Sequence, residues 1–313
     1  MSALIYQIFS SAALMSQGLY HLICATTNHL KSPRDSAAKP FHAVGGHHGN
    51  RLLRYLQLYI AILCLIVAFI HQLVVASYSD PLLLGSTPVH AFLSLQSAAV
   101  IFSFLVLTVA LLLSDSTASL PVPADIFFAL AAVLFFLQYS NSSSAAAVQI
   151  SDLQSKLDSV SGRISALSSS LCLILSCFPK LFIADASLGL SFCLQGFWAL
   201  QTGLTLYVDA FIPEGCHRLL GAGGVEGSTK CELDDSKLRA VAILDLVFVV
   251  YVFFVLVMFL AVYCGVARAV GIRSRFGSYE ALPIAGNAAS ATATAVAVDS
   301  NHIQMKAMSG TQA

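Results

Sequence analysis

Charged residues are scarce in this chain: they make up only 10% of its 313 residues, while 57% are apolar. A soluble globular protein has about 25% charged residues and 45–50% apolar ones. Positive and negative residues are balanced at 16 each, and no long block of one sign occurs. This charge pattern gives no support to nucleic-acid binding. The scarcity of charge excludes an ordinary soluble domain and favours a membrane protein.

Signatures of catalysis are missing as well. The sequence has no HExxH zinc motif, no GxSxG nucleophile elbow and no phosphate-binding loop. His42, His47 and His48 lie in one loop, but no Cys or carboxylate completes a ligand set at metal spacing. We therefore interpret these histidines as solvated, and we expect a protein that is not an enzyme and needs no cofactor.

Long apolar runs dominate what is present. A bilayer core about 30 Å thick takes about 20 helical residues to cross. Runs of this kind predict transmembrane helices at residues 3–25, 55–76, 89–113, 124–140, 160–178, 186–208 and 238–264. No Lys or Arg precedes the first run, unlike a secretory signal, so we expect it to be retained. The predicted fold is all-α, a polytopic seven-helix transmembrane bundle over residues 1–275.

The remaining residues, 276–313, are rich in Ala, Ser and Thr and predict a disordered tail. Loops one, three and five share a side of the membrane with this tail. That side carries ten Lys and Arg, against six on the other. The positive-inside rule then predicts an outer N-terminus and a cytosolic C-terminus, in an endomembrane or the plasma membrane.

The segment between the fourth and sixth runs allows two interpretations. One helical stripe is indicated by apolar residues at steps of four and three: Leu153, Leu157, Val160, Ile164, Leu167 and Leu171. Either one long helix enters the membrane near Ser165, or a surface helix joins a short span. Asp152 and Lys156 are spaced to pair on such a helix. Asn141 begins a glycosylation sequon directly after the fourth run, and we expect it to stay unmodified.

The sixth run carries small residues on or near one helical face: Gly189, Cys193, Gly196 and Gly203. Small residues let helix backbones approach closely in lipid, where apolar burial gives no net attraction between helices. We therefore place this helix centrally in the bundle. The same face is a candidate surface for a homo- or hetero-oligomer.

Few polar side chains fall within the predicted spans. Asp245 lies about two turns into the last helix, and an ionisable group there is a functional candidate by default. His21 is one candidate partner, although the two are predicted near opposite ends of the bundle. The alternative is that Asp245 only stabilises a helix N-terminus. Gln96, Gln195 and Gln201 are interpreted as hydrogen-bonding links between helices rather than substrate ligands.

Several stretches resemble a known family: GLYHL in the first run, VHAFLSLQS in the third, FPKLF, and FCLQGFWALQTGLTLYVDAFIPEGCHRL followed by KCELDDSKLRAVAILDLVF. They are similar to the plant branch of the transmembrane protein 45-like family, also called the domain of unknown function 716 family. The resemblance covers most of residues 1–275. It implies a multi-pass membrane protein without an assigned activity.

The sequence departs from this family in its histidines. Similar proteins usually have HNFEHS in the third helix, where this chain has HAFLS beginning at His90, and FHLHS in the fourth, where it has FFLQY. Only His90 remains of that set. Metal or proton chemistry based on those histidines is therefore not implied here.

The resemblance also implies paired cysteines in the loop after the sixth run, where Cys216 and Cys231 lie. A disulfide there would contribute roughly 3 kcal/mol in the chain-entropy model. The predicted outer side is an oxidising compartment, where such bonds persist. Two free thiols in a mobile loop are the alternative, and we favour the disulfide.

Three functions stay open. The first hypothesis is a non-enzymatic interaction or scaffold protein, suggested by the small-residue face and the few ionisable groups in the spans. A small-solute transporter or channel would use Asp245 and the glutamines. A seven-helix receptor fits the topology, but only by analogy. The lipid bilayer is the partner that all three share.

Overall fold

The apolar runs form seven long helices in the part of the chain that the computed structural model describes. That part comprises residues 2–33, 36–42, 55–77, 89–117, 122–149, 151–220 and 226–271. The helices are α1 (Ser2–Lys31), α3 (Leu56–Ser77), α4 (Val89–Ser116), α5 (Ala124–Val148), α6 (Asp152–Cys177), α7 (Phe182–Tyr207) and α8 (Asp234–Ala269). All seven are long and apolar enough to cross a membrane. The predicted all-α, seven-helix fold is confirmed, and the predicted tail at 276–313 lies outside the described residues.

The long loop after α7 contains elements that the sequence did not predict. A short 3-10 helix, η1 (Asp209–Phe211), is followed by strands β1 (Cys216–Leu220) and β2 (Glu226–Cys231). The two strands form an antiparallel hairpin in which Cys216 lies opposite Cys231. These strands contain little of the β-branched and aromatic content by which strands are usually predicted, so the pattern indicated only a polar loop.

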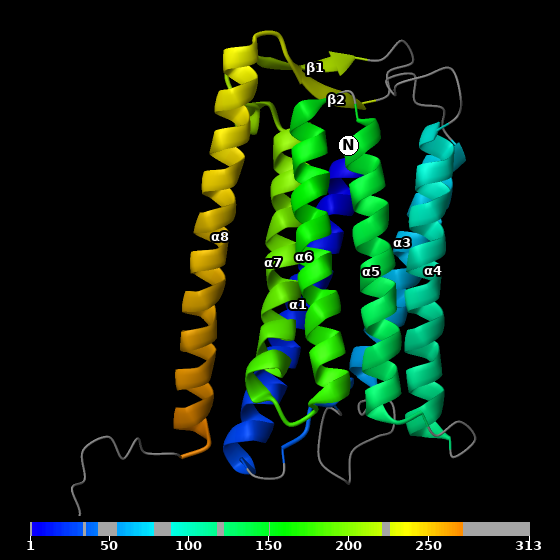
Figure 1. The fold of residues 1–313 in the computed structure, drawn as a ribbon, viewed down its shortest axis with the longest axis vertical. Helices are drawn as coiled ribbons and strands as arrows, with labels where there is room; N and C mark the ends of the chain where they lie inside the picture. Colours follow the sequence, from blue (N-terminus) through cyan, green and yellow to red (C-terminus); the bar gives the residue numbers. More distant parts are fainter. Residues whose placement is uncertain are drawn as a thin grey trace, which may run out of the picture. The chain divides into compact units, whose positions relative to one another are not determined.

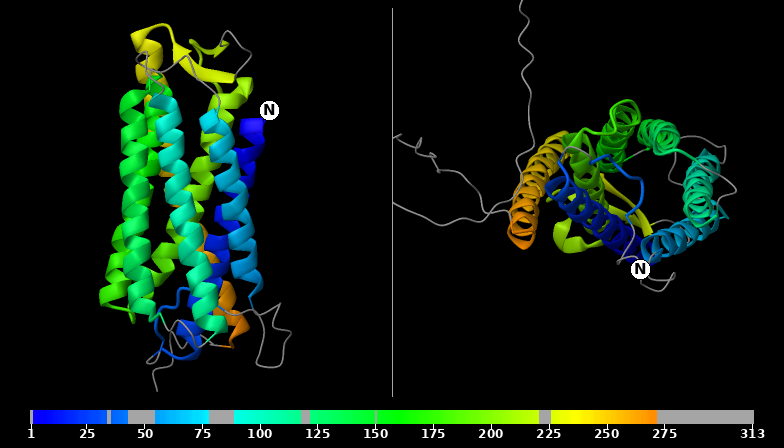
Figure 2. Two further views of the ribbon diagram at one scale, coloured as in Figure 1. Left: turned by 90° about the vertical axis from the view of Figure 1, so that its right-hand side faces the viewer. Right: turned by 90° about the horizontal axis from the view of Figure 1, so that it is seen from below.

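The helices run side by side along one direction (Figure 1). The start of α1, the starts of α6 and α8, and the hairpin lie together, and we call this the hairpin end. The turn between α6 and α7, residues 178–181, lies at the opposite end, which we call the turn end. α1 packs most closely against α7, α5 against α6 and α3 against α4, whereas α8 lies at the edge of the bundle (Figure 2).

Several helices extend beyond the predicted apolar runs. α1 continues past its predicted end to Lys31, α5 continues to Val148, and α7 begins earlier than predicted, at Phe182. The extension of α5 is the segment SNSSSAAAV, in which alanine, the strongest helix former, offsets the serines. Polar residues at the helix ends are thus drawn into the helices, and several of them become buried.

α6 is one continuous helix, the first of the two alternatives for its segment. Its start is capped by Ser151, whose hydroxyl accepts a hydrogen bond from the backbone N–H of Gln154. The predicted stripe is buried against α7 and α8 at Leu153, Leu157, Val160 and Ile164. Leu167 departs from this stripe, because 48% of its surface is exposed.

The α1–α7 seam is the contact between α1 and the Gly189, Cys193, Gly196 and Gly203 face of α7. A Cβ atom added to Gly18 would lie 2.6 Å from the carbonyl oxygen of Gly189, and one added to Gly189 would lie 3.0 Å from that of Gly18. The backbones therefore touch, as small residues allow in lipid. Because α1 covers this face within the chain, the face is not free to form an oligomer.

Candidate functional site

A buried His–Asp pair joins α1 to α7 near the turn end. Nε2 of His21 lies 2.9 Å from Oδ1 of Asp185, and each residue is only 6% exposed. An ionisable group inside a bundle is costly unless it is paired and hydrogen-bonded, and it is a functional candidate by default. This pair is therefore the starting point for the candidate site.

Local structure explains why these two residues meet. Asp185 stands in the first turn of α7, where the positive end of the helix dipole favours a carboxylate. The α1–α7 seam then brings His21 within reach. A Cβ atom at Gly189 would lie 3.3 Å from Cδ2 of the His21 ring, so a larger residue at this position would press on the ring.

The segment 36–42, which follows α1, is anchored beside this pair at the turn end. The backbone N–H of Ala38 donates to the carbonyl oxygen of Pro179 at 2.6 Å. The hydroxyl of Tyr20 donates to the carbonyl oxygen of His42 at 3.0 Å. The rings of His21 and His42 have their centroids 5.3 Å apart. A third titratable side chain thus adjoins the pair.

His42 is half-buried, which corrects the interpretation that it is solvated. Its Nε2 atom is buried and has no partner among the described residues. The pKa of the His42 imidazole is lowered to about 4, mainly by burial; His21 and Lys39 act in the same direction, and Asp185 opposes them. The neutral ring is therefore the form that this position favours.

A cavity of about 330 Å³ lies beside the pair, among α1, α3, α4, α5, α6 and α7. Aromatic rings form much of its wall: Phe104, Phe127, Phe128, Phe135 and Phe192. The polar residues of the wall are Ser16, Gln17, His21, Gln57 and Thr108. Ligand sites typically have volumes of about 300–1,000 Å³ and a mainly apolar lining with a few polar groups. The cavity meets both criteria.

A second, much smaller cavity of about 10 Å³ is lined by Asp185 together with His29, Ser36 and Lys180, among others. This is about the space of one water molecule. Asp185 lines the small cavity, and its partner His21 lines the large one. The pair therefore forms part of the partition between them, and it can hold a proton there or offer a hydrogen bond to a molecule in the large cavity.

Asp245 pairs with Lys156 and not with His21, the candidate partner from the sequence. Its Oδ1 lies 2.7 Å from Nζ of Lys156, an ion pair that joins α6 to α8. Asp152 pairs with Lys237 at 2.9 Å, so the predicted pair within one helix, Asp152 with Lys156, is replaced by two pairs between helices. A pair within one helix contributes only about 0.2–0.5 kcal/mol, so a neighbouring helix with opposite charges readily competes.

Two of the three predicted glutamine links are present. Nε2 of Gln195 donates to Oγ of Ser161 on α6 at 2.7 Å, and the hydroxyl of Tyr251 on α8 donates to Oε1 of Gln201 at 2.8 Å. Gln96 is exposed on α4, and within the described part of the chain it makes no hydrogen bond to another helix. Its prediction as a link is therefore wrong, because its side of α4 faces away from the bundle.

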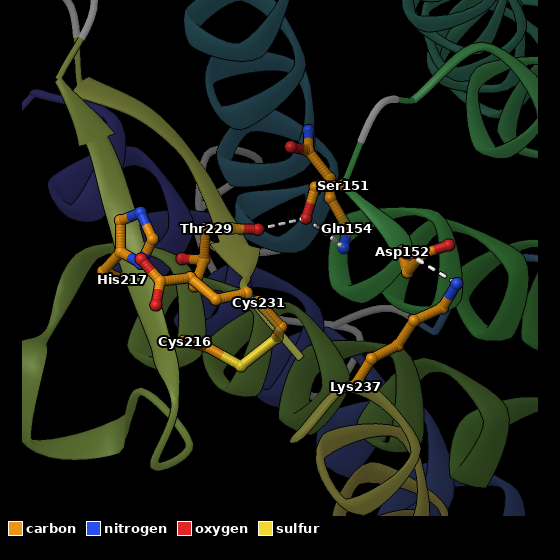
Figure 3. The surroundings of a disulfide bond; sticks show 9 residues. Ser151, Asp152, Gln154, Cys216, His217, Thr229, Cys231 and Lys237 are labelled. Atoms are coloured by element: carbon orange, nitrogen blue, oxygen red, sulfur yellow. Dashed lines mark hydrogen bonds and ion pairs between the residues drawn. A yellow bond between two sulfur atoms is a disulfide. The ribbon is translucent and has the colours of Figure 1, made fainter. Parts of the chain in front are cut away.

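The hairpin end is closed by a disulfide between Cys216 and Cys231, the pair that the resemblance implied (Figure 3). The hydroxyl of Ser151 donates to the carbonyl oxygen of Thr229, which ties β2 to the start of α6. The Asp152–Lys237 ion pair lies beside these groups (Figure 3). We call the hairpin with its disulfide the cap.

The remaining sequence candidates do not form a site. His47 and His48 lie outside the described residues, and the residues that are described contain no group of three or more His, Cys, Asp or Glu suited to a metal. Asn141 is only 3% exposed, and its Nδ2 donates to Oγ of Ser97 at 2.6 Å. A side chain held in this way has no room for a glycan.

Sequence reasoning missed two residues of the candidate site. Asp185 falls just before the predicted start of its helix at residue 186, so it was assigned to a loop. The signal for an earlier start is the Pro179–Lys180 break, after which nothing prevents a helix from beginning at Phe182. Gln57 lies next to a charged loop and has no sequence feature that distinguishes it.

A family model, described as a family of unknown function (DUF716), matches residues 124–264, which run from the start of α5 into the last part of α8. No curated protein matches the chain. Asp185 lies within the matched residues, whereas His21 and Gln57 lie before them. The match supports assigning the segment from α5 to α8 to this family of unknown function.

Proposed function

We propose that this protein binds a small, mainly apolar molecule in the 330 Å³ cavity and acts through that binding rather than by catalysis. The observation that carries the proposal is the cavity itself, with its aromatic wall and its few polar groups. An engineered apolar cavity of about 150 Å³ is enough to bind benzene. Receptor and carrier functions share this binding step.

The interaction or scaffold hypothesis has less support. Its sequence argument was the small-residue face of α7, and α1 occupies that face. A homo- or hetero-oligomer would need another surface, such as the apolar residues of α8 that are exposed outside the bundle, among them Leu246, Val249 and Phe253. Exposed apolar residues on a membrane helix are equally suited to lipid, so they do not single out a protein partner.

We also propose that the turn end is cytosolic and the hairpin end faces the lumen or the cell exterior. Lys31, Lys39, Lys180 and Arg268 are at or near the turn end. The loops and tail assigned to that side carry ten Lys and Arg against six on the other side, in agreement with the positive-inside rule. The disulfide is at the hairpin end, and disulfides persist in oxidising compartments. On the motifs quoted above, we further propose that the chain belongs to the plant branch of the transmembrane protein 45-like family.

Filling the cavity tests the proposed function. Full-length protein in lipid nanodiscs is irradiated with a photoreactive diazirine probe that has a short hydrocarbon chain, and the labelled residues are mapped by mass spectrometry. We expect labels on cavity-lining residues of the wild type. Ala61→Trp places a large ring at the cavity wall and should abolish this labelling.

Leu63→Trp is the matched control, because Leu63 is on the same helix but is 61% exposed. It should leave the labelling of the cavity unchanged. Labels confined to the outer, lipid-facing residues of the wild type would contradict the proposed function.

A further inference from the structure

Gln57 brings an unpaired polar group to the cavity. The residue is only 9% exposed, it lines the cavity, and its Oε1 is buried without a hydrogen-bond partner among the described residues. Leaving such a group unpaired destabilises the protein, because the group loses its hydrogen bonds to water. A molecule in the cavity that donates a hydrogen bond to Oε1 of Gln57 would remove this destabilisation. The unpaired oxygen therefore indicates that the molecule carries a hydrogen-bond donor.

Two polar groups of the wall, Gln57 and His21, lie at one end of the cavity. Gln57 stands in the first turn of α3, and His21 pairs with Asp185 in the first turn of α7; both helices begin at the turn end. Leu65 is eight residues further along α3 than Gln57, or about 12 Å at 1.5 Å per residue, and it also lines the cavity. The cavity therefore runs from Gln57 and His21 near the turn end to a mainly apolar part deeper in the bundle.

The charges near Gln57 and His21 restrict which polar group the ligand can carry. His21 is already paired with the Asp185 carboxylate at 2.9 Å, so the pair offers no net positive charge to a carboxylate on the ligand. Gln57 and Gln17 are neutral and offer both donors and acceptors. The Thr108 hydroxyl donates to the carbonyl oxygen of Phe104 and can still accept. A hydroxyl is a donor and an acceptor at once, so it pairs with the Gln57 side chain whichever of its amide atoms faces the cavity.

We infer that the ligand class is an apolar alcohol, with its hydroxyl paired to Gln57 near His21 and its hydrocarbon part among the aromatic rings. This inference rests on the proposed function and specifies the chemistry of the same cavity. The geometry that carries it is the juxtaposition of a buried Gln57 amide oxygen, without a partner among the described residues, with a mainly apolar cavity.

The experiment compares three matched competitors of the diazirine probe in nanodiscs: 1-decanol, its methyl ether and decanoate. Pairing of one otherwise unsatisfied buried group corresponds to a preference of about tenfold. We therefore expect 1-decanol to displace the probe at about one tenth of the concentration that the ether requires, and decanoate to be weaker than the alcohol. Gln57→Leu keeps the side-chain size but removes the amide, and should bring alcohol and ether to within about twofold.

Gln96→Leu is the control, because Gln96 is exposed and does not line the cavity. It should keep the full preference for the alcohol. Equal displacement by alcohol and ether in the wild type would overturn the inference while leaving the proposed function intact, whereas absence of cavity labelling by the probe itself would overturn both. The wild-type comparison decides the question even if Gln57→Leu does not fold.

Discussion

Both α1 and α8 pack against α7, but the two contacts are built differently. Along the α1–α7 seam, glycine faces glycine, and a Cβ atom at Gly18 would approach backbone atoms to within 3 Å. Along α8, the contact consists of rings. Phe248 meets Trp198 edge to face with centroids 5.7 Å apart, and Tyr251 stacks on Phe197 at 5.6 Å.

The difference follows from what can hold helices together in lipid. Apolar burial gives little net attraction there, so close backbone contact, hydrogen bonds and ion pairs must supply it. The α1–α7 seam relies mainly on close packing, with the His21–Asp185 pair at its turn end. α8 relies on ring contacts, a hydrogen bond to Gln201 and ion pairs to α6. A helix contact that depends on close backbone packing is disrupted by any added side-chain atoms. A helix contact that depends on separate polar pairs can be weakened one pair at a time.

Adding side-chain atoms to the seam should have the largest effect. Gly18→Leu places atoms where the backbone of Gly189 already lies, and neither backbone can move without separating the helices. We expect a loss of at least about 3 kcal/mol, which lowers the melting temperature of the protein in nanodiscs by roughly 6–12 °C.

Gly265→Leu is the control for this change, because nothing lies within 4 Å of a Cβ atom at that position of α8. It should leave the melting temperature nearly unchanged. Equal losses for the two variants would show that the α1–α7 seam is no more tightly packed than the outer face of α8.

Protonation of His42 should lower the stability of the folded protein, because this ring is half-buried beside the turn end of the α1–α7 seam. The pKa of this ring is lowered to about 4 from an ordinary value near 6.5, so the unfolded chain binds the proton more readily than the folded protein. Stability is therefore full above about pH 6.5 and falls as the pH drops toward about 4. The loss is at most about 3–4 kcal/mol, at about 1.4 kcal/mol per pKa unit. Thermal unfolding measured across this pH range checks it.

His42→Gln removes the titrating group and should flatten the dependence of stability on pH between about 4 and 6.5. His29→Gln changes a histidine of the same region that stacks on Phe182 instead, and it should keep the dependence. An unchanged slope in His42→Gln would assign the effect to another group.

The ion pair between Lys156 and Asp245 should give the smallest effect. Its side chains are 20% and 55% exposed, and pairs of this kind contribute about 0.2–1 kcal/mol. A double-mutant cycle with Lys156→Met and Asp245→Asn should return a coupling in this range, measured by thermal unfolding. Coupling above about 2 kcal/mol would mean that α8 is held as firmly as α1, contrary to the comparison.

The fold was predictable because a membrane-spanning helix needs an apolar run about as long as the bilayer is thick. The length of such a run is a local property of the sequence. The small-residue face of α7 was also predictable from local sequence, because Gly189, Gly196 and Gly203 are seven residues apart and fall on one side of any α-helix. Their partner was not predictable. Gly18 is one of 19 glycines, and only the packed structure selects it.

The candidate site depends on contacts between distant parts of the chain, which a sequence pattern does not report. His21 and Asp185 are 164 residues apart. The pairing of Asp152 and Lys156 was predicted from their spacing on one helix, but each found a partner on α8 because that helix lies alongside. The burial of His42 likewise depends on the Tyr20 hydrogen bond and on the α6–α7 turn, neither of which its loop composition indicates.

The length of α8 sets the position of the cap. Its 36 residues extend about 54 Å at 1.5 Å per residue, while the hydrocarbon layer is about 30 Å thick. The charged first turns, with Asp234, Asp235 and Arg239, belong to the excess at the hairpin end. The disulfide-bonded strands precede this excess in the chain and therefore lie outside the hydrocarbon layer, at the hairpin end.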